Sequence, residues 1–146
     1  MRLLIFIILI IGAALLQGAG WTLFAVSPNF FLAVLFIAAL TLSDFLSFGI
    51  VALVGLIAIR FQPGLSWAPL LAVGLTLVLY WIKSYLPWLE IFTVVAGLFA
   101  VTFLFYLIFD PRFVFQHPTI IFLEALYNIV IGGGLFMLMP RVSAKK

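Results

Sequence analysis

Long apolar runs dominate the sequence, and short segments containing proline, glycine or charge separate them. Hydrophobic residues make up 68% of the 146 positions and charged residues 8%, whereas a soluble domain has roughly 25% charged residues. A soluble core cannot bury that much apolar surface. The chain is therefore expected to be an all-α integral membrane protein, because helices satisfy their own backbone hydrogen bonds in a lipid bilayer. We expect one polytopic domain over residues 1–146.

Turn signals divide the chain into about six expected transmembrane helices. The run from Phe30 to Ile59 is ambiguous, because one helix would be about 45 Å long while a hydrocarbon core is about 30 Å thick. Ser43 and Asp44 interrupt this run, and either side chain could N-cap a second helix. Two short, hairpin-like crossings are preferred over one long tilted helix. The expected helices cover approximately residues 3–26, 30–42, 45–59, 67–86, 89–109 and 119–139.

The basic residues favour six crossings over five. Six crossings place five basic residues on the side of both termini and two opposite, whereas five crossings divide them three against four. Loops on the cytoplasmic side are enriched in Lys and Arg, so both termini are expected in the cytoplasm, as in a bacterial inner membrane protein. The five residues on that side would be Arg2, Lys83, Arg141, Lys145 and Lys146, with Arg60 and Arg112 opposite.

The residues of two connecting segments indicate how those segments lie at the membrane surface. The 67–86 helix ends in three aromatic residues and Lys83, which is typical of an interfacial aromatic belt with a lysine that snorkels to water. Lys83 and Glu90 flank the next turn and can pair across it; two separate solvated charges are the alternative. Residues 110–118 are expected to form a loop with an aromatic middle.

The last apolar run contains the polar residues that most need an explanation. Glu124 and Asn128 are four residues apart and Tyr127 is three from Glu124, so a helix places all three on one stripe. An acidic residue in a spanning helix costs roughly 2.5 to 3.5 kcal/mol on insertion scales, so the stripe is expected to point inward. It could be a structural clasp between helices, a docking surface for a partner, or a ligand or proton site.

Small residues indicate where helices can approach closely. Gly132, Gly133 and Gly134 follow the polar stripe within about a turn and can admit a neighbouring helix. Ala14 and Gly18 form a small-xxx-small pair in the first helix, although chance spacing explains such a pair equally well.

The residue inventory argues against catalysis. Cysteine is absent, and one histidine with four scattered acidic residues gives no metal cluster, so no metal or cofactor is expected. His117 is expected on the opposite side from Asp44 and Glu90, so the sequence suggests no catalytic residues. The glycines at 132–134 lack the lysine of a phosphate loop. The basic residues are scattered rather than clustered, so nucleic acid is not an expected partner.

The order of these features resembles the bacterial rod-shape-determining MreD family. The closest local match is Glu-Ala-Leu-Tyr-Asn at 124–128, followed by small and apolar residues and a basic tail. Gly55 and Leu56 match part of a Gly-Leu-x-x-Asp pattern of that family, with Ile59 in place of the acid. The resemblance implies a non-enzymatic inner-membrane scaffold of the cell-shape and peptidoglycan elongation machinery. Its expected partners are an MreC-like protein and transmembrane cell-wall synthases.

The MreD family is similar in fold to the substrate-binding subunits of energy-coupling-factor vitamin transporters, and this gives the alternative function. A small-molecule pocket would then be framed by Glu124, Tyr127 and Asn128, with Trp67 or Arg112. A vitamin pocket needs several convergent donors and acceptors. The shortage of polar residues outside the last helix therefore favours the scaffold.

Overall fold

The computed structural model describes residues 1–20, 22, 26–60, 67–85 and 91–139, and the regular structure within these ranges is helical. Seven α-helices and one 3-10 turn follow one another in the described ranges. They are α1 (Arg2–Gly18), α2 (Phe30–Thr41), α3 (Phe45–Arg60), α4 (Ala68–Ile82), η1 (Lys83–Tyr85), α5 (Ile91–Phe109), α6 (Pro111–Gln116) and α7 (Pro118–Leu138).

Three segments are long and apolar enough to cross a membrane: Ala68–Tyr85, Ile91–Phe109 and Pro118–Leu138. The apolar helices α1, α2 and α3 are shorter. Large apolar side chains also cover the outside of the molecule, for example Ile8 on α1 and Val130 on α7, which are 63% and 66% exposed. Such an apolar exterior is unfavourable in water. The protein is therefore a membrane protein.

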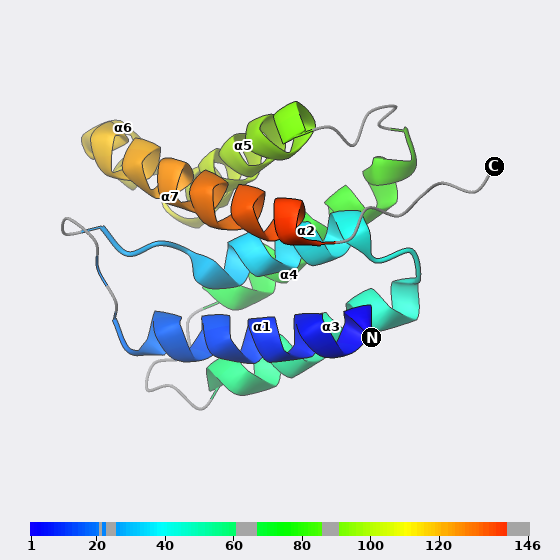
Figure 1. Cartoon of the computed structure of the whole chain (residues 1–146). Coiled ribbons are helices and arrows are strands. Elements are labelled where there is room, and N and C mark those ends of the chain that lie inside the picture. Colours follow the sequence, from blue (N-terminus) through cyan, green and yellow to red (C-terminus); the bar gives the residue numbers. More distant parts are fainter. Residues whose placement is uncertain (21, 23–25, 61–66, 86–90, 140–146) are drawn as a thin grey trace.

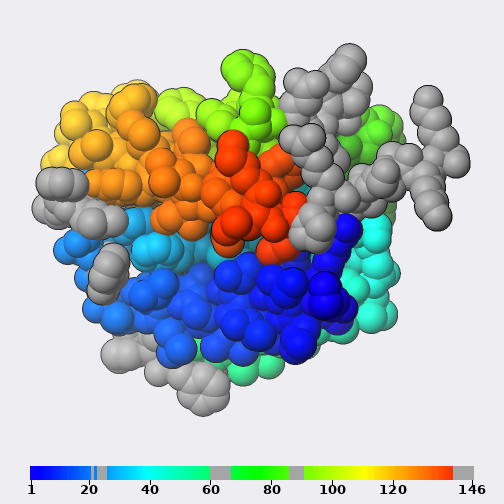
Figure 2. All heavy atoms as spheres, viewed as in Figure 1, coloured from blue at the N-terminus to red at the C-terminus, as the bar shows by residue number. Residues whose placement is uncertain are grey.

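The short helix α2 lies at the centre of the bundle. It packs against α1, α4 and α7 and makes smaller contacts with α3 and α5, while α1 pairs with α3 and α5 with α7. Figure 1 shows these helices lying nearly parallel or antiparallel, with the start of α1 and the end of α7 at the same end of the bundle. Figure 2 shows one face of the molecule, on which α1 and α7 form two long bands.

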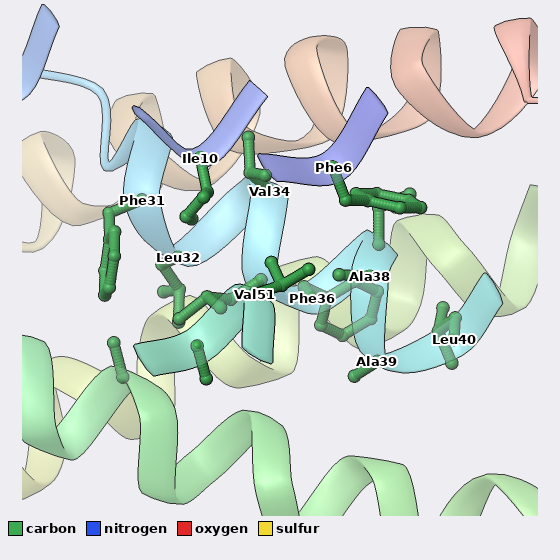
Figure 3. Close-up of a cluster of buried hydrophobic side chains, with 14 of the residues drawn as sticks. Phe6, Ile10, Phe31, Leu32, Val34, Phe36, Ala38, Ala39, Leu40 and Val51 are labelled. Atoms are coloured by element: carbon green, nitrogen blue, oxygen red, sulfur yellow. The ribbon is translucent and has the colours of Figure 1, made fainter. Parts of the chain in front are cut away.

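Every residue of α2 from Phe31 to Leu40 is buried. A helix that is apolar on all sides is stable when other helices or lipid surround it, and here helices surround it. Figure 3 shows Phe6 and Ile10 of α1 and Val51 of α3 among the α2 side chains. With 12 residues, α2 is only about 18 Å long. The first turn is buried at Asn29, so other side chains must supply partners for the backbone amides there.

Two glycines allow close approach to α2. A Cβ atom on Gly55 of α3 would lie 2.6 Å from Phe31 Cε2 and 2.7 Å from Ile10 Cγ1. A Cβ atom on Gly97 of α5 would lie 2.6 Å from Phe36 Cζ. These distances are shorter than van der Waals contact, so a larger residue would push the helices apart.

Residues 30–59 form two helices with a tight break at residues 42–44. Asp44 N-caps α3: its Oδ2 accepts hydrogen bonds from the Ser47 amide at 2.9 Å and the Ser47 hydroxyl at 2.8 Å. The Ser47 hydroxyl and amide hold the pKa of Asp44 below its usual value, so the cap stays ionised at neutral pH. On the other side of the break, the Ser43 carbonyl accepts a hydrogen bond from the Tyr80 hydroxyl at 2.9 Å.

Two sequence expectations about local structure are wrong. The first helix does not continue to residue 26; it ends at Gly18, and Gly20 adopts a left-handed φ of 65° that stops a helix. The expected loop at 110–118 contains the short helix α6, because the Asp110 side chain accepts hydrogen bonds from the amides of Arg112 and Phe113 and caps it.

Ala14 and Gly18 do not form one packing face. Ala14 is buried, whereas Gly18 is exposed at the last turn of α1. The expected Lys83–Glu90 pair cannot be placed, because Glu90 lies outside the described ranges. The basic residues of the tail, Arg141, Lys145 and Lys146, lie outside them as well.

Candidate functional site

The polar stripe of α7 faces α5 in a regular antiparallel register. Thr102 of α5 contacts Asn128, and one turn away Tyr106 contacts Glu124. One turn in the other direction, Leu98 lies against Gly132. Three successive turns of the two helices are therefore matched, and two of them carry polar pairs.

Asn128 joins three helices. Its Nδ2 donates to Thr102 Oγ1 of α5 at 3.0 Å, and its Oδ1 accepts a hydrogen bond from the Asn29 amide at 3.1 Å. Asn29 is the N-cap of α2, and its own Oδ1 accepts from the Leu32 amide at 3.0 Å. Asn29, Thr102 and Asn128 are all buried. Asn128 therefore fixes the first turn of the central helix to α5 and α7.

Gln17 supports the same turn of α2 from another side. Its Oε1 accepts a hydrogen bond from the Phe31 amide at 3.1 Å. The first amide groups of a helix have no partner within the helix. Side chains from α1 and α7 supply such partners here, so the N-terminal turn of α2 is held inside the protein rather than at a water surface.

Glu124 is 3% exposed and has one hydrogen-bond partner among the described residues. The Tyr106 hydroxyl donates to its Oε2. Its Oε1 is buried and has no hydrogen-bond partner in the described part of the chain. We define Asn29, Thr102, Tyr106, Glu124 and Asn128 as the polar junction.

The C-terminal end of α2 is held by α4 and η1. The Lys83 ammonium donates to the Ala39 carbonyl at 2.7 Å and to the Leu42 carbonyl, and it lies 3.7 Å from the centre of the Tyr80 ring. Lys83 thus turns back onto a helix end, and a cation there interacts favourably with the helix dipole. The lysine that the sequence places in the interfacial belt donates hydrogen bonds to carbonyls at the C-terminal end of α2.

We expect Lys83→Met to lower the free energy of unfolding by about 1.5 kcal/mol, because it keeps most of the aliphatic stem but leaves two carbonyls of α2 without their charged donor. Denaturation in mixed detergent micelles measures this change. Tyr80→Phe is the matched control: it removes only the hydrogen bond to Ser43 and should have a smaller effect. Equal stability of Lys83→Met and the parent protein would contradict this function of Lys83.

The other predicted site residues are distributed around the polar junction. Tyr127 is partly buried beside it. Gly132 is a close-contact position, where a Cβ atom would lie 2.6 Å from Leu98 Cδ1, whereas a Cβ atom on Gly134 would meet nothing within 4 Å. Gly133 is buried, and the nearest atom to an added Cβ would be Ile91 Cδ1 at 3.9 Å, an ordinary contact. One of the three glycines therefore admits a neighbouring helix closely.

Within the described ranges, the side chains of Trp67 and Arg112 make no hydrogen bond with the polar junction. The Trp67 ring lies 5.1 Å from that of Phe109, and Arg112 is exposed on α6. In the same ranges no group of three or more His, Cys, Asp and Glu side chains could hold a metal ion.

Glu124 and Asn128 are buried, 3% and 0% exposed. The stripe points inward as the sequence predicts, and its hydrogen bonds connect helices of the same chain. Sequence reasoning missed Asn29, Gln17, Thr102 and Tyr106. The only local signal was the position of Asn29 immediately before an apolar run, which is typical of an N-cap.

Comparison with known proteins identifies no relative. No family model, curated protein or solved structure matches the chain.

Proposed function

We propose that this protein is a non-enzymatic scaffold in the bacterial inner membrane, of the MreD type, with six crossings and both termini in the cytoplasm. In this proposal it holds transmembrane helices of an MreC-like protein and of cell-wall synthases within the peptidoglycan elongation machinery. Two features support it: the resemblance of residues 124–128 to the MreD family, and the exposed apolar side of α7.

A scaffold is supported by the contrast between the polar side chains inside the bundle, which bind one another, and the apolar side chains on its outer surface. Polar side chains of the junction bond mainly to one another and to the end of α2, so few donors and acceptors remain to converge on a ligand. The outer stripe of α7, by contrast, is continuous and apolar along successive turns and can pack against a partner helix. Its large exposed residues are Phe122, Leu126, Val130 and Met137.

Six crossings are consistent with the way α2 is embedded. A helix of about 18 Å is too short to reach both surfaces of a bilayer. The side chains of Gln17, Asn128 and Lys83 bind backbone groups at its two ends. In this proposal α2 crosses the bilayer core where the other helices surround it.

Photo-crosslinking in cells tests the scaffold. A photoreactive phenylalanine analogue at Phe122, which is 55% exposed on α7, is expected to crosslink to an MreC-like protein or a wall synthase. The matched control is the same analogue at Phe105, which is 4% exposed and should crosslink only within the chain. Mass spectrometry identifies the products.

The outcome at Phe122 separates the functional alternatives. Crosslinks to the energy-coupling subunits of a transporter would support the vitamin-binding alternative and overturn the scaffold. Crosslinks to lipid alone from Phe122 and from Ile8 on the outside of α1 would also overturn it.

A further inference from the structure

Glu124 Oε1 stands out among the buried polar atoms. It is the one buried side-chain nitrogen or oxygen without a hydrogen-bond partner in the described part of the chain. Asn128, one turn along the same helix, uses both of its polar atoms in hydrogen bonds. The junction therefore satisfies the amide fully and the carboxyl group only in part.

An ionised carboxylate is poorly suited to this position. Burying a charge without a partner ion is far more costly than burying a neutral group, and the Tyr106 hydroxyl offers only one hydrogen bond. A neutral carboxylic acid removes the charge and still bonds to Tyr106.

The helices packed against α7 bring no compensating cation to Glu124 within the described ranges. From α5 the titratable group facing it is Tyr106, and α2 has no titratable side chain. On α6, Arg112 is exposed. The remaining nearby titratable groups are Tyr127 on α7 itself and the exposed Asp110 and His117 at the ends of α6.

We propose that Glu124 is a proton-binding site inside the membrane, whose buried carboxyl group holds a proton at neutral pH. Glu124 is six residues beyond Pro118, about 9 Å along α7 from the end of the bundle that carries α6. Ionisation would leave a charge facing α5, so it should loosen the contact between the two helices. This inference does not depend on the proposed function.

Infrared spectroscopy of the purified full-length protein tests the site directly. Solvent-exposed carboxyl groups are ionised at neutral pH, so a carbonyl stretch of a protonated carboxylic acid would report a buried acid. We expect this band in the parent protein and in Glu90→Gln, and its loss in Glu124→Gln. As the pH rises, the band should fall about tenfold per pH unit beyond its midpoint, as for one proton.

Absence of the band from the parent protein at neutral pH, or its persistence in Glu124→Gln, would overturn the proposal. Because the first of these results comes from the parent protein, it does not require a variant that folds.

The pH dependence of stability is a second readout. A carboxyl group that binds its proton more tightly in the folded than in the unfolded state stabilises the fold at low pH, and this stabilisation is lost as the pH rises. The parent protein should therefore lose more stability than Glu124→Gln as the pH rises from the pKa of an unfolded glutamate, roughly 4.3, to neutral pH. Equal slopes, or a steeper loss in Glu124→Gln, would contradict the site.

Discussion

Replacing Asn128 by leucine is expected to lower the free energy of unfolding by about 2 to 4 kcal/mol. The substitution keeps a similar side-chain volume but removes the hydrogen bonds to Thr102 and to the Asn29 amide. The buried Asn29 amide would then have no partner at the start of α2, and an unsatisfied buried donor is costly. Denaturation of the purified protein in mixed micelles would measure the loss.

Thr102→Val is the matched control for Asn128→Leu. Valine has nearly the shape of threonine, and this variant breaks only the bond between α5 and α7 while the bond from Asn29 to Asn128 remains. We expect a loss of about 1 kcal/mol or less. The double variant should be little worse than Asn128→Leu, because both changes remove the same bond. If Asn128→Leu instead folded normally and only lost partner crosslinks, the polar junction would not hold the helices together.

Gly55→Val should destabilise the protein by about 2 to 3 kcal/mol through overpacking. The added Cβ atom would lie 2.6 Å from Phe31 Cε2 and 2.7 Å from Ile10 Cγ1, so α3 would have to move away from both α1 and α2. Both neighbours are core side chains, 1% and 0% exposed. The same unfolding measurement reports the effect.

Gly49→Val, in the same helix α3, controls for the change in helix propensity. A Cβ atom on Gly49 meets nothing within 4 Å, and valine is a somewhat better helix former than glycine. We therefore expect this variant to be as stable as the parent or slightly more so. Similar losses at Gly49 and Gly55 would show that the helix backbone, and not the contact with α2, determines the result.

These predictions concern different regions of the same central helix. Asn128 fixes the first turn of α2, and Gly55 allows α3 to reach its side. The far end of α2 is held by Lys83, which donates to two of its carbonyls. Loss of any one of these contacts should therefore be detected as a change in the stability of the whole bundle, because α2 contacts most of the other helices.

The sequence alone determined the class of protein and much of the local structure. A composition with 8% charged residues requires an apolar environment, and the spacing of Glu124 and Asn128 placed both on one inward stripe of a helix. The polar Ser43 and Asp44 predicted the break between α2 and α3, since an acidic N-cap acts on the amides that immediately follow it. Each of these inferences depends on neighbours within a few residues.

The tertiary structure decided which residues meet. An apolar helix has the same sequence pattern whether lipid or protein surrounds it, so the central position of α2 could not be predicted. The partners of Asn128 and Lys83 lie on other helices, and the packing register between helices determines those pairs. The same register separates Gly132, which admits Leu98, from Gly134, which meets nothing. A local pattern predicts which face of a helix is buried, but only packing determines what that face contacts.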